Sequence, residues 1–366
     1  MVPLLFFLRY DHQQEHWVMK HVNKETFLAT SKSSESSFML GSHKWTIHND
    51  SKKCSPDHMT YTKTLTMHTC NPEKEFACDN AFCILMKKRC DGTENCEDGS
   101  DEQECGKLIV ESGYKKSLTP LPKEGQDLPV NLSLTIIDIL SINELEESFS
   151  VKFSYKREWF DRRLTYKHLK QDSSMNNLLI EESESIWYPY LVFNNIETNA
   201  KVSVTKVENT HRVIANKKFK YVVKDNMHLF TGSENAQSLT KEWSVEWICH
   251  YTLHWYPFDT QVCRMEFITQ RTSTKMSPVN LKSYPSIALN RYTLDKIQMC
   301  RSIINERNAI VAEVTLGRPI ISNILTVFIP TTTLLTISFV ARFFAKDYID
   351  MVIQVNITIL LVLATL

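Results

Sequence analysis

Glycine is scarce in this sequence, and so is any excess of charge of one sign. Only 8 of the 366 residues are glycine, and neither GxxxxGK(S/T) nor GxGxxG occurs, which excludes the usual phosphate-binding loops. The 42 basic residues equal the 42 acidic ones, and no basic block suits a nucleic acid. HExxH and GxSxG motifs are missing too. The sequence therefore predicts neither an enzyme nor a nucleic-acid-binding protein.

Ionisable side chains are also missing between Arg318 and Arg342. The gap, Pro319–Ala341, is 23 residues long, about what a helix needs to cross roughly 30 Å of hydrocarbon. We expect a transmembrane helix over 319–341, kinked by Pro330. Neighbouring helices and Thr331–Thr333 can satisfy the freed backbone groups, which favours a helix bundle over a lone anchor.

A second apolar run, 351–366, is expected to be a partial membrane helix, so we interpret the sequence as a fragment. Val2–Leu8 is apolar but short, and no cation precedes it, which suggests that a signal peptide is missing. Arg342 and Lys346 lie in the connection between the two apolar runs. Their charges predict that this connection is cytoplasmic and that the N-terminal region is extracellular.

Six of the ten cysteines lie between Cys70 and Cys105. This segment has too few apolar residues for a core, so it needs disulfides and an oxidising compartment. It also contains ten acidic and four basic residues, a net charge of −6. Carboxylates at this density repel one another unless a hard cation binds them, and oxygen ligands select calcium. The alternative is an acidic surface without a metal.

The Cys-Asp-Gly and Asp-Gly-Ser-Asp-Glu motifs of this segment resemble those of the low-density lipoprotein receptor class A repeat, over 70–105. The resemblance implies the disulfides Cys70–Cys83, Cys78–Cys96 and Cys90–Cys105. It also implies a calcium ion bound by the side chains of Asp91, Asn95, Asp101 and Glu102 and by the carbonyls of Lys88 and Thr93. Asn95 stands where the family usually has aspartate, which predicts a weaker calcium affinity.

The segments around this repeat carry fewer signals. Residues 1–69 alternate polar and apolar side chains in places, which predicts a β-rich segment, such as the end of a lectin-like or pentraxin-like domain. Residues 106–128 are expected to be a linker. Asn49 and Asn131 begin NDS and NLS, which are glycosylation acceptors in an extracellular chain.

Residues 129–317 contain short segments rich in β-branched and aromatic residues, which predict an immunoglobulin-like β-sandwich. Cys249 and Cys263 flank thirteen residues of this region, and we expect a disulfide that closes the loop. The tip of the loop is Tyr256-Pro257-Phe258-Asp259. Its aromatic side chains need an apolar surface, which the loops of a membrane domain offer. An ordinary hairpin disulfide leaves these aromatics unexplained.

This Cys-x6-(F/Y)-P-x-D-x3-Cys loop resembles that of pentameric ligand-gated, or Cys-loop, ion channels. Further matches follow in the family's order: Trp159–Leu164 fits W-x-D-x-R-L, and Trp187–Pro189 fits W-x-P-D, although Tyr190 replaces the acid. Arg318 fits the basic residue before the first membrane helix, and Pro330 fits the proline within it. The resemblance implies a multi-pass plasma-membrane channel subunit. The resemblance also implies that the subunit assembles with like subunits into a homo- or hetero-pentamer in the lipid bilayer, and that the pentamer binds a small-molecule ligand and passes inorganic ions.

The second apolar run carries polar residues on one helical face, at Gln354, Thr358, Leu361 and Thr365. Such a stripe predicts a pore lining, with Leu361 as the hydrophobic constriction, and hydrogen bonding between helices is the alternative. Asp350 stands near the pore mouth, and the Pro-Ala-Arg sequence of anion-selective relatives is missing. We therefore expect cation selectivity.

In this family the ligand binds between subunits, among aromatic residues of several loops. The aligned positions here are Ser154, Lys156, Asn194 and Gln270, and Met299–Asn308, expected to cap the site, also lacks aromatics. The binding of an amine by cation–π contacts therefore has little support. Lys156 either holds a ligand carboxylate or is a solvated charge. Cys54 and Cys300 have no assigned partner.

A second functional class also fits part of the sequence. The calcium-binding repeat could serve an adhesion or endocytic receptor, or a truncated decoy subunit, that binds protein ligands through its acidic residues. The ordered motifs of the sandwich and of the membrane helices favour the channel subunit instead.

Overall fold

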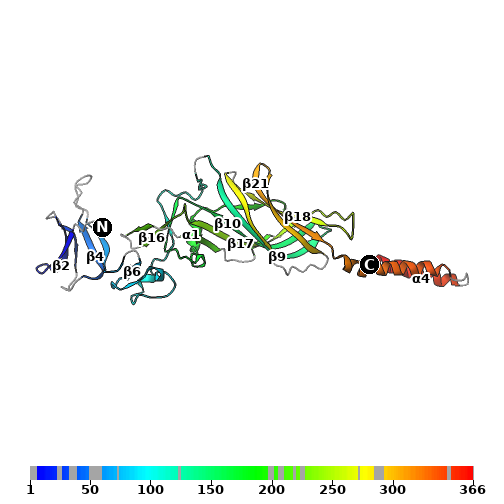
Figure 1. Cartoon of the computed structure of the whole chain (residues 1–366), viewed down its shortest axis with the longest axis horizontal. Helices are drawn as coiled ribbons and strands as arrows, with labels where there is room; N and C mark the ends of the chain where they lie inside the picture. The colour runs from blue at the N-terminus through cyan, green and yellow to red at the C-terminus, as the bar shows by residue number, and fades with distance from the viewer. Residues whose placement is uncertain are drawn as a thin grey trace. The chain divides into compact units, whose positions relative to one another are not determined.

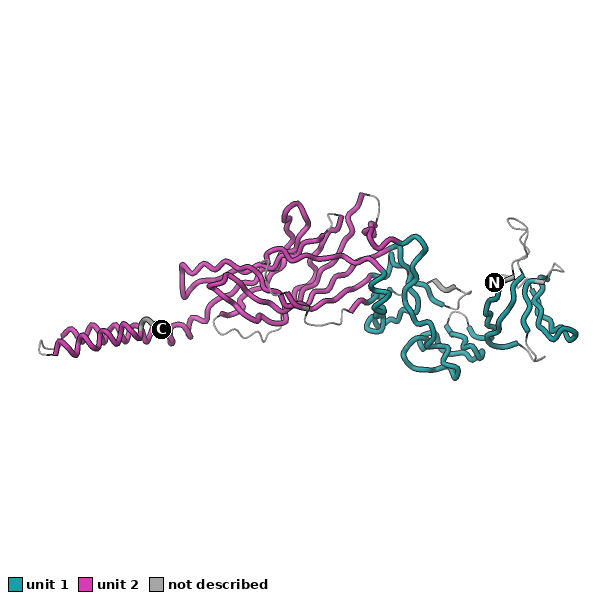
Figure 2. Tube along the Cα trace, turned by 180° about the vertical axis from the view of Figure 1, so that it is seen from behind, with its two compact units in different colours: residues 1–114, 162–185, 212–236 teal, residues 115–161, 186–211, 237–366 magenta. Residues whose placement is uncertain are grey.

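The computed structural model shows two compact units (Figures 1 and 2). The first contains residues 1–114, 162–185 and 212–236, and the second contains residues 115–161, 186–211 and 237–366. The structure describes residues 6–22, 27–32, 39–48, 60–71, 74–122, 125–196, 202–204, 210–216, 220–222, 227–270, 273–283, 292–343 and 348–365. Asn49, Cys54 and Lys346, singled out from the sequence, lie outside these residues.

The second unit is built around a β-sandwich. One sheet has the order β13-β17-β10-β9-β19, with β14 also paired to β17, and the other has the order β12-β18-β21-β20. Strands β9 and β19 run parallel, whereas β10 is antiparallel to both β9 and β17. The strands are β9 (Leu128–Asn143), β10 (Ser148–Trp159), β12 (Leu191–Phe193), β13 (Val202–Val204), β14 (Thr210–Ile214), β17 (Ala236–Ile248), β18 (Gln261–Thr269), β19 (Thr274–Ser283), β20 (Thr293–Ile304) and β21 (Arg307–Gly317).

The two sheets are held together by apolar side chains that recur with a period of two along the strands. In β10, Val151 and Phe153 are fully buried, whereas Lys152 between them is partly exposed. The ring of Phe153 lies 6.1 Å from that of Trp247 on β17 and 5.6 Å from that of Phe267 on β18. Each such buried side chain contributes about 1.5–3 kcal/mol. This core holds the strand ends, and therefore the loops between them, in place.

After the sandwich, α2 (Ile320–Asn323), a π-helical turn η5 (Ile324–Phe328) and α3 (Ile329–Ala341) form one continuous helix. It is long and apolar enough to cross a membrane, and α4 (Ile349–Thr365) contains a shorter apolar stretch. The π-helical turn immediately precedes α3, where Pro330 lacks a backbone N–H. The hydroxyl of Thr331 donates to the carbonyl of Val327 (2.7 Å), so a side chain satisfies a carbonyl beside the proline.

The first unit begins with a five-stranded antiparallel sheet whose strands follow sequence order. Trp17, Ala29, Met39 and Trp45 form its small core. The β-rich segment expected at 1–69 is therefore a meander, and its relation to lectin-like domains stays a prediction. The strands are β1 (Phe6–Asp11), β2 (His16–His21), β3 (Phe27–Ser31), β4 (Gly41–His48) and β5 (Thr60–Met67).

The cysteine-rich module follows in the same unit. It contains the paired strands β6 (Glu75–Ala77) and β7 (Cys83–Leu85) and two short 3-10 helices, η1 (Met86–Lys88) and η2 (Ser100–Glu102). Around one buried aromatic, Phe76, disulfides replace a core. They join the pairs that the resemblance implies: Cys70–Cys83, Cys78–Cys96 and Cys90–Cys105.

A four-stranded sheet with the order β15-β16-β11-β8 completes the first unit. Its strands are β8 (Leu108–Val110), β11 (Leu164–Lys167), β15 (Lys220–Val222) and β16 (Met227–Thr231), and η3 (Ser173–Met175) and α1 (Ile180–Ser185) lie between β11 and β12 in the chain. Residues 106–128, expected to be a linker, thus contribute strand β8. Glu182 of α1 accepts hydrogen bonds from the amides of Lys107 (2.7 Å) and Leu108 (3.0 Å).

The predicted fold class is confirmed. A mainly β region with a disulfide-rich module precedes an apolar helix that is long enough to span a membrane. Among the described residues, the long apolar helices form near the C-terminal end, where extended apolar runs lack ionisable side chains, whereas helices elsewhere, such as α1, are short.

Two buried histidines predict acid sensitivity. Burial, reinforced by the charge of Arg89, lowers the pKa of His168 to about 3, and burial lowers the pKa of His211 to about 4. Below the unfolded pKa of about 6.5, the unfolded chain takes up protons that the folded chain does not, so acid favours unfolding. We expect each histidine to cost up to about 1.4 kcal/mol per pH unit below that value. Chemical denaturation of the ectodomain between pH 7 and 5 measures this loss.

The same titration has a matched control. Replacing His211 with glutamine should remove part of the pH dependence, whereas replacing the exposed His254 should leave it unchanged. Equal slopes in both variants would contradict the assignment to buried histidines.

Candidate functional site

A charged cluster lies where the sandwich meets its first helix. The Arg318 guanidinium donates from Nε to Asp259 Oδ1 (2.7 Å) and from its terminal nitrogen to Glu144 Oε1 (3.0 Å). It also donates to the hydroxyl of Tyr292 (2.8 Å), which itself donates to Glu144. The side chains of Arg318 and Asp259 are only 5% and 2% exposed. Arg318, two residues before α2, therefore links three parts of the sandwich to the start of the helix.

The electrostatics of this cluster favour the charged forms. Burial by itself raises the pKa of Asp259, but hydrogen bonds from Arg318 and Gln261 outweigh it, and the net pKa lies below the usual range. Burial by itself lowers the pKa of Arg318, but its hydrogen bonds to Asp259 and Glu144 outweigh this effect, and the net pKa lies above the usual value. A desolvated arginine–carboxylate pair of this kind is stable only while both partners are present.

The loop closed by Cys249–Cys263 carries Asp259 at its tip. Tyr256 lies against Arg318, with the guanidinium carbon 4.8 Å from its ring centroid. Trp255 and Phe258 are 76% and 62% exposed. The aromatic tip expected from the sequence is therefore divided: one ring packs on the charged cluster, and two present an apolar surface. Trp255 was not among the residues predicted for the tip.

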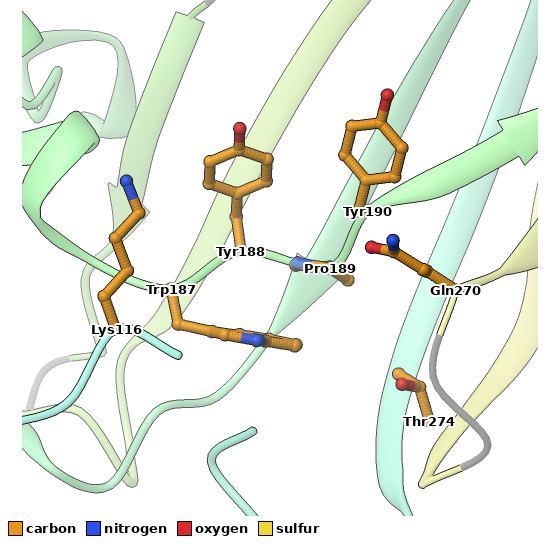
Figure 3. Close-up of a pocket in the computed structure, with 7 residues that line it drawn as sticks. All are labelled: Lys116, Trp187, Tyr188, Pro189, Tyr190, Gln270 and Thr274. Atoms are coloured by element: carbon orange, nitrogen blue, oxygen red, sulfur yellow. The ribbon is translucent and has the colours of Figure 1, made fainter. Parts of the chain in front are cut away.

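A pocket of about 190 Å³ lies at the segment that fits W-x-P-D, within the second unit (Figure 3). Figure 3 shows the rings of Tyr188 and Tyr190 pointing to the same side, with Gln270 close to Tyr190. The backbone N–H of Gln270 donates to the backbone carbonyl of Tyr190 (3.3 Å). This hydrogen bond joins the two loops that carry these residues. None of the lining residues is acidic; they are Lys116, Trp187, Tyr188, Pro189, Tyr190, Gln270 and Thr274.

Two cationic side chains, Arg157 and Lys241, lie near Tyr188, one of the residues that line this pocket. Arg157 is 1% exposed and donates to the carbonyl of Pro189, and among the described residues it has no carboxylate partner. Its guanidinium carbon lies 6.0 Å from the Tyr188 ring, and the Lys241 ammonium lies 5.5 Å from the same ring. Burial lowers the pKa of both Arg157 and Lys241, and the charge of Arg157 lowers that of Lys241 further. The pocket wall is thus positively charged.

The four positions predicted for the ligand site fall in different places. Gln270 lines the pocket. Asn194 instead donates to the carboxylate of Glu266 (2.7 Å). Ser154 and Lys156 lie on the less buried face of β10, and Lys156 pairs with Glu158 two residues along that face. A shared site would therefore require a second copy of the sandwich.

From the sequence, no ligand-site role was predicted for the pocket residues other than Gln270. None was predicted for Arg157 or Lys241 either. A signal existed for one of them, because Arg157 falls on the buried phase of the β10 alternation. A charged side chain in that phase indicates a special role. The tyrosine at position 190 was noted only as a departure from a motif.

The segment Met299–Asn308 forms the end of the β20–β21 hairpin. Its turn residues, Asn305 and Glu306, both have positive φ (49° and 62°), as a tight two-residue hairpin turn requires. Ile303 near the tip is 76% exposed, and Cys300 is an exposed free thiol. The hairpin therefore brings an aliphatic side chain, rather than an aromatic one, to its tip.

The predicted pore-lining residues lie on the open side of α4. Gln354, Thr358 and Leu361 are exposed, whereas Ile359 is buried. Asn356 accepts a hydrogen bond from Ser338 of α3 (2.5 Å). One side of α4 thus packs on α3, and the polar stripe lies away from this contact; Thr365 also belongs to α4, at its last position.

The residues predicted to hold calcium gather around Asn95. Its side-chain nitrogen, Nδ2, donates to Asp91 Oδ1 (3.3 Å) and to the carbonyl of Thr93 (2.7 Å). Asp101, which is fully buried, accepts from the Asn95 backbone (2.8 Å), and Glu102 accepts from the Asp91 amide (2.7 Å). Two oxygens thus already converge on a positively polarised NH₂ group, and the all-oxygen donor set suits calcium.

Other clusters of possible metal ligands in the described residues do not fit a metal. Both that lie within 4.8 Å contain a disulfide: Cys70, Glu75 and Cys83 form one, and Cys78, Cys96 and Asp98 form the other. Sulfurs in a disulfide are not thiolates and cannot act as anionic ligands. The Asn95 region remains the candidate calcium site; Lys88, whose carbonyl is also a predicted ligand, is the last residue of η1.

Replacing Asn95 with aspartate is expected to tighten calcium binding by about tenfold or more, because it adds a charge and replaces an NH₂ donor with an oxygen ligand. Isothermal calorimetry on the ectodomain measures the change. The matched control is Asn80→Asp, in the same module but with its side chain on the Phe82 amide. Equal affinities in the Asn95 variant and the unmodified protein would refute this assignment.

Residues 102–316, more than half of the chain, match the family described as neurotransmitter-gated ion-channel ligand binding domain, and residues 68–105 match low-density lipoprotein receptor domain class A. Both resemblances are therefore confirmed. Curated relatives include the acetylcholine receptor subunit delta of Xenopus laevis, which is 24% identical over 197 residues (53% of this chain, 33% of the relative). The glutamate-gated chloride channel of Drosophila melanogaster is 21% identical over 266 residues (69% and 54%). The glutamate-gated chloride channel subunit beta of Haemonchus contortus is 22% identical over 286 residues (73% and 62%). The chain spans less than two thirds of the length of each.

Proposed function

Because the chain belongs to the neurotransmitter-gated ion-channel ligand binding domain family, whose members are ligand-gated channels and not enzymes, we propose that it is a subunit of a pentameric ligand-gated ion channel. Its sandwich is the extracellular receptor domain, and α2 to α4 contribute to the membrane domain of a plasma-membrane protein. The ligand binds between the sandwiches of neighbouring subunits.

The Arg318 cluster is the observation that carries this proposal. Arg318 lies two residues before the helix that is long enough to span a membrane, Ile320–Ala341, and it is bonded to Asp259 of the disulfide loop and to Glu144 after β9. Any movement of these loops is therefore transmitted to the start of the helix through short, buried, charged contacts. Ligand binding that favours one arrangement of the loops shifts the population of the pore state.

The pocket chemistry favours an anionic ligand. Lys116 lines it, and Arg157 and Lys241 lie behind Tyr188 without acidic lining residues nearby. The Tyr188 ring already has the Lys241 ammonium over it, 5.5 Å from the ring centroid, so a ligand amine at this ring would meet like charge. We propose that a small carboxylate binds here, with its body against the tyrosine rings.

Voltage clamp of cells expressing the full-length gene product tests this function. L-glutamate and succinate serve as anionic probes, and acetylcholine serves as the cationic one. A dose-dependent current with a carboxylate, lost in a Tyr190→Ala variant and kept in a Tyr61→Ala variant, supports the proposal. Current evoked by acetylcholine alone would refute the anionic ligand but not the channel.

The pore is proposed to select cations. Asp350 lies in the first turn of α4, where five copies would form an acidic ring beside the polar stripe. The expected result is a reversal potential that follows external sodium and not chloride. An Asp350→Asn variant should reduce this selectivity, and a potential that tracks chloride would contradict it.

A further inference from the structure

One lysine of the first unit, Lys170, follows β11 and contacts the class A repeat of the same unit. The backbone amide of Lys170 donates to Asn176 Oδ1 (2.7 Å), and the Asn176 amide donates to the Lys170 carbonyl (2.8 Å). Asn176 is fully buried and also donates to the Val213 carbonyl (3.1 Å). The main chain at Lys170 is thus fixed on both sides, so its side chain starts from a defined position.

The ammonium of Lys170 ends on the repeat. Its Nζ donates to the carbonyls of Lys87 (2.6 Å) and Arg89 (2.5 Å). These carbonyls flank Lys88, whose own carbonyl is a predicted calcium ligand. Burial lowers the pKa of Lys170, while the carboxylates of Asp91 and Glu102 oppose this change. The ammonium therefore lies in the field of the same acidic residues that are predicted to bind calcium.

Positive charge surrounds the predicted calcium ligands. Asp91, Asp101 and Glu102 are three acids, because Asn95 stands where the family usually has a fourth. The charge of Asp101 acts on Arg89, and the charges of Asp91 and Glu102 act on Lys170. The Lys170 ammonium is therefore attracted to the same acidic group that is predicted to bind calcium.

An open pocket of about 780 Å³ lies beside Lys170, lined by Met86 of the repeat and by His168, Met175 and Phe230 among others. Side chains that face one another across an open pocket make few van der Waals contacts, so the polar contacts of Lys170 matter for docking. A second anchor, Lys167 Nζ to the Glu104 carbonyl (3.2 Å), fixes only the C-terminal end of the repeat.

We propose that Lys170 couples calcium binding by the class A repeat to the docking of that repeat on residues 162–185 of the same unit. With the acidic loop ordered, the Lys87 and Arg89 carbonyls are presented to the ammonium, and the repeat is docked. With the loop disordered, the contact is lost and the repeat moves about its β8 attachment. This proposal rests on the calcium site and is independent of the channel function.

Hydrogen exchange of the ectodomain, with calcium and with EGTA, tests the coupling. In the unmodified protein, chelation should speed exchange at 86–105 and also at 167–176. In Lys170→Met, exchange at 167–176 should no longer respond to calcium, and calcium affinity measured by calorimetry should fall about fivefold. Lys170→Arg should restore both effects in part, because it keeps the charge.

The control is Lys44→Met, which removes an exposed lysine from β4 of the same unit and should change neither readout. An unchanged calcium response at 167–176 in Lys170→Met would overturn the proposal. So would an unmodified protein that binds calcium by calorimetry without any change in exchange at 167–176. Absence of calcium binding would overturn it at its premise, and this result is distinguishable because calorimetry alone reports it.

Discussion

Replacing Arg318 with methionine is expected to destabilise the ectodomain by about 3 kcal/mol and to abolish ligand-evoked current. The reason is that Asp259, 2% exposed, would remain buried without its cation, and an uncompensated buried carboxylate costs about 3–5 kcal/mol. The connection from the disulfide loop to the first helix would be lost in the same change. Chemical denaturation measures the stability, and voltage clamp measures the current.

Two variants separate the buried pair from surface charge. Arg264→Met removes an arginine that is 60% exposed and pairs with Glu313 on the same sandwich, and it should cost less than about 1 kcal/mol. Asp259→Asn combined with Arg318→Met should recover part of the lost stability, because no buried charge is then left unpaired. If Arg264→Met and Arg318→Met lowered the free energy of unfolding equally, the Arg318 cluster would contribute no more stability than a surface ion pair.

Replacing Arg157 with methionine should have opposite effects on stability and on ligand binding. Its guanidinium is 1% exposed and has no carboxylate partner among the described residues, so removing the charge relieves a desolvation cost. We expect a gain of about 1 kcal/mol or more in the free energy of unfolding. We also expect the carboxylate ligand to bind about tenfold more weakly, because a positive charge behind the pocket is lost.

Lys152→Met is the matched control for this prediction. Lys152 lies on the same strand, but it is 34% exposed and pairs with Glu242. Its loss should leave both stability and ligand affinity almost unchanged. If Arg157→Met destabilises the sandwich without changing the apparent affinity, then Arg157 is a structural residue and the anionic ligand loses its main support.

Much of the fold was predictable because its signals are local. Residues 148–159, one of the segments rich in β-branched and aromatic residues that predict the sandwich, are the whole of β10. The charge-free stretch 319–341 corresponds to the helix from Ile320 to Ala341. In both cases neighbouring residues set the pattern, either through the two-residue period of a strand or through the length of an apolar run.

The linker was less predictable because strand pairing is not local. Leu108–Val110 is only three residues long and becomes a strand only because β11, more than fifty residues later, offers a free edge. The short segment carries no recognisable alternation of its own. The docking of the class A repeat through Lys170 was likewise invisible, since Lys170 and Lys87 are separated by 83 residues.

The ligand pocket shows the same division. Gln270 was singled out by its motif position, but its neighbour Tyr190 and the cations Arg157 and Lys241 come from three different strands or loops. Register across the sheet places Lys241 opposite Tyr155, and no local pattern encodes that register. Positive charge at the pocket therefore appears only after the strands are paired.

Local motifs, through their resemblance to known families, predicted the channel family and the cysteine-rich module. Strand-forming segments and the length of the apolar run predicted the sandwich and the membrane helix. Each of these signals lies in consecutive residues. Folding was needed to bring Arg318 to Asp259 and Glu144, Lys241 to Tyr188, and Lys170 to the carbonyls of the repeat. Each of these contacts joins residues far apart in the chain. Their energies come from burial and low local dielectric, which exist only once the sheets and the repeat have packed.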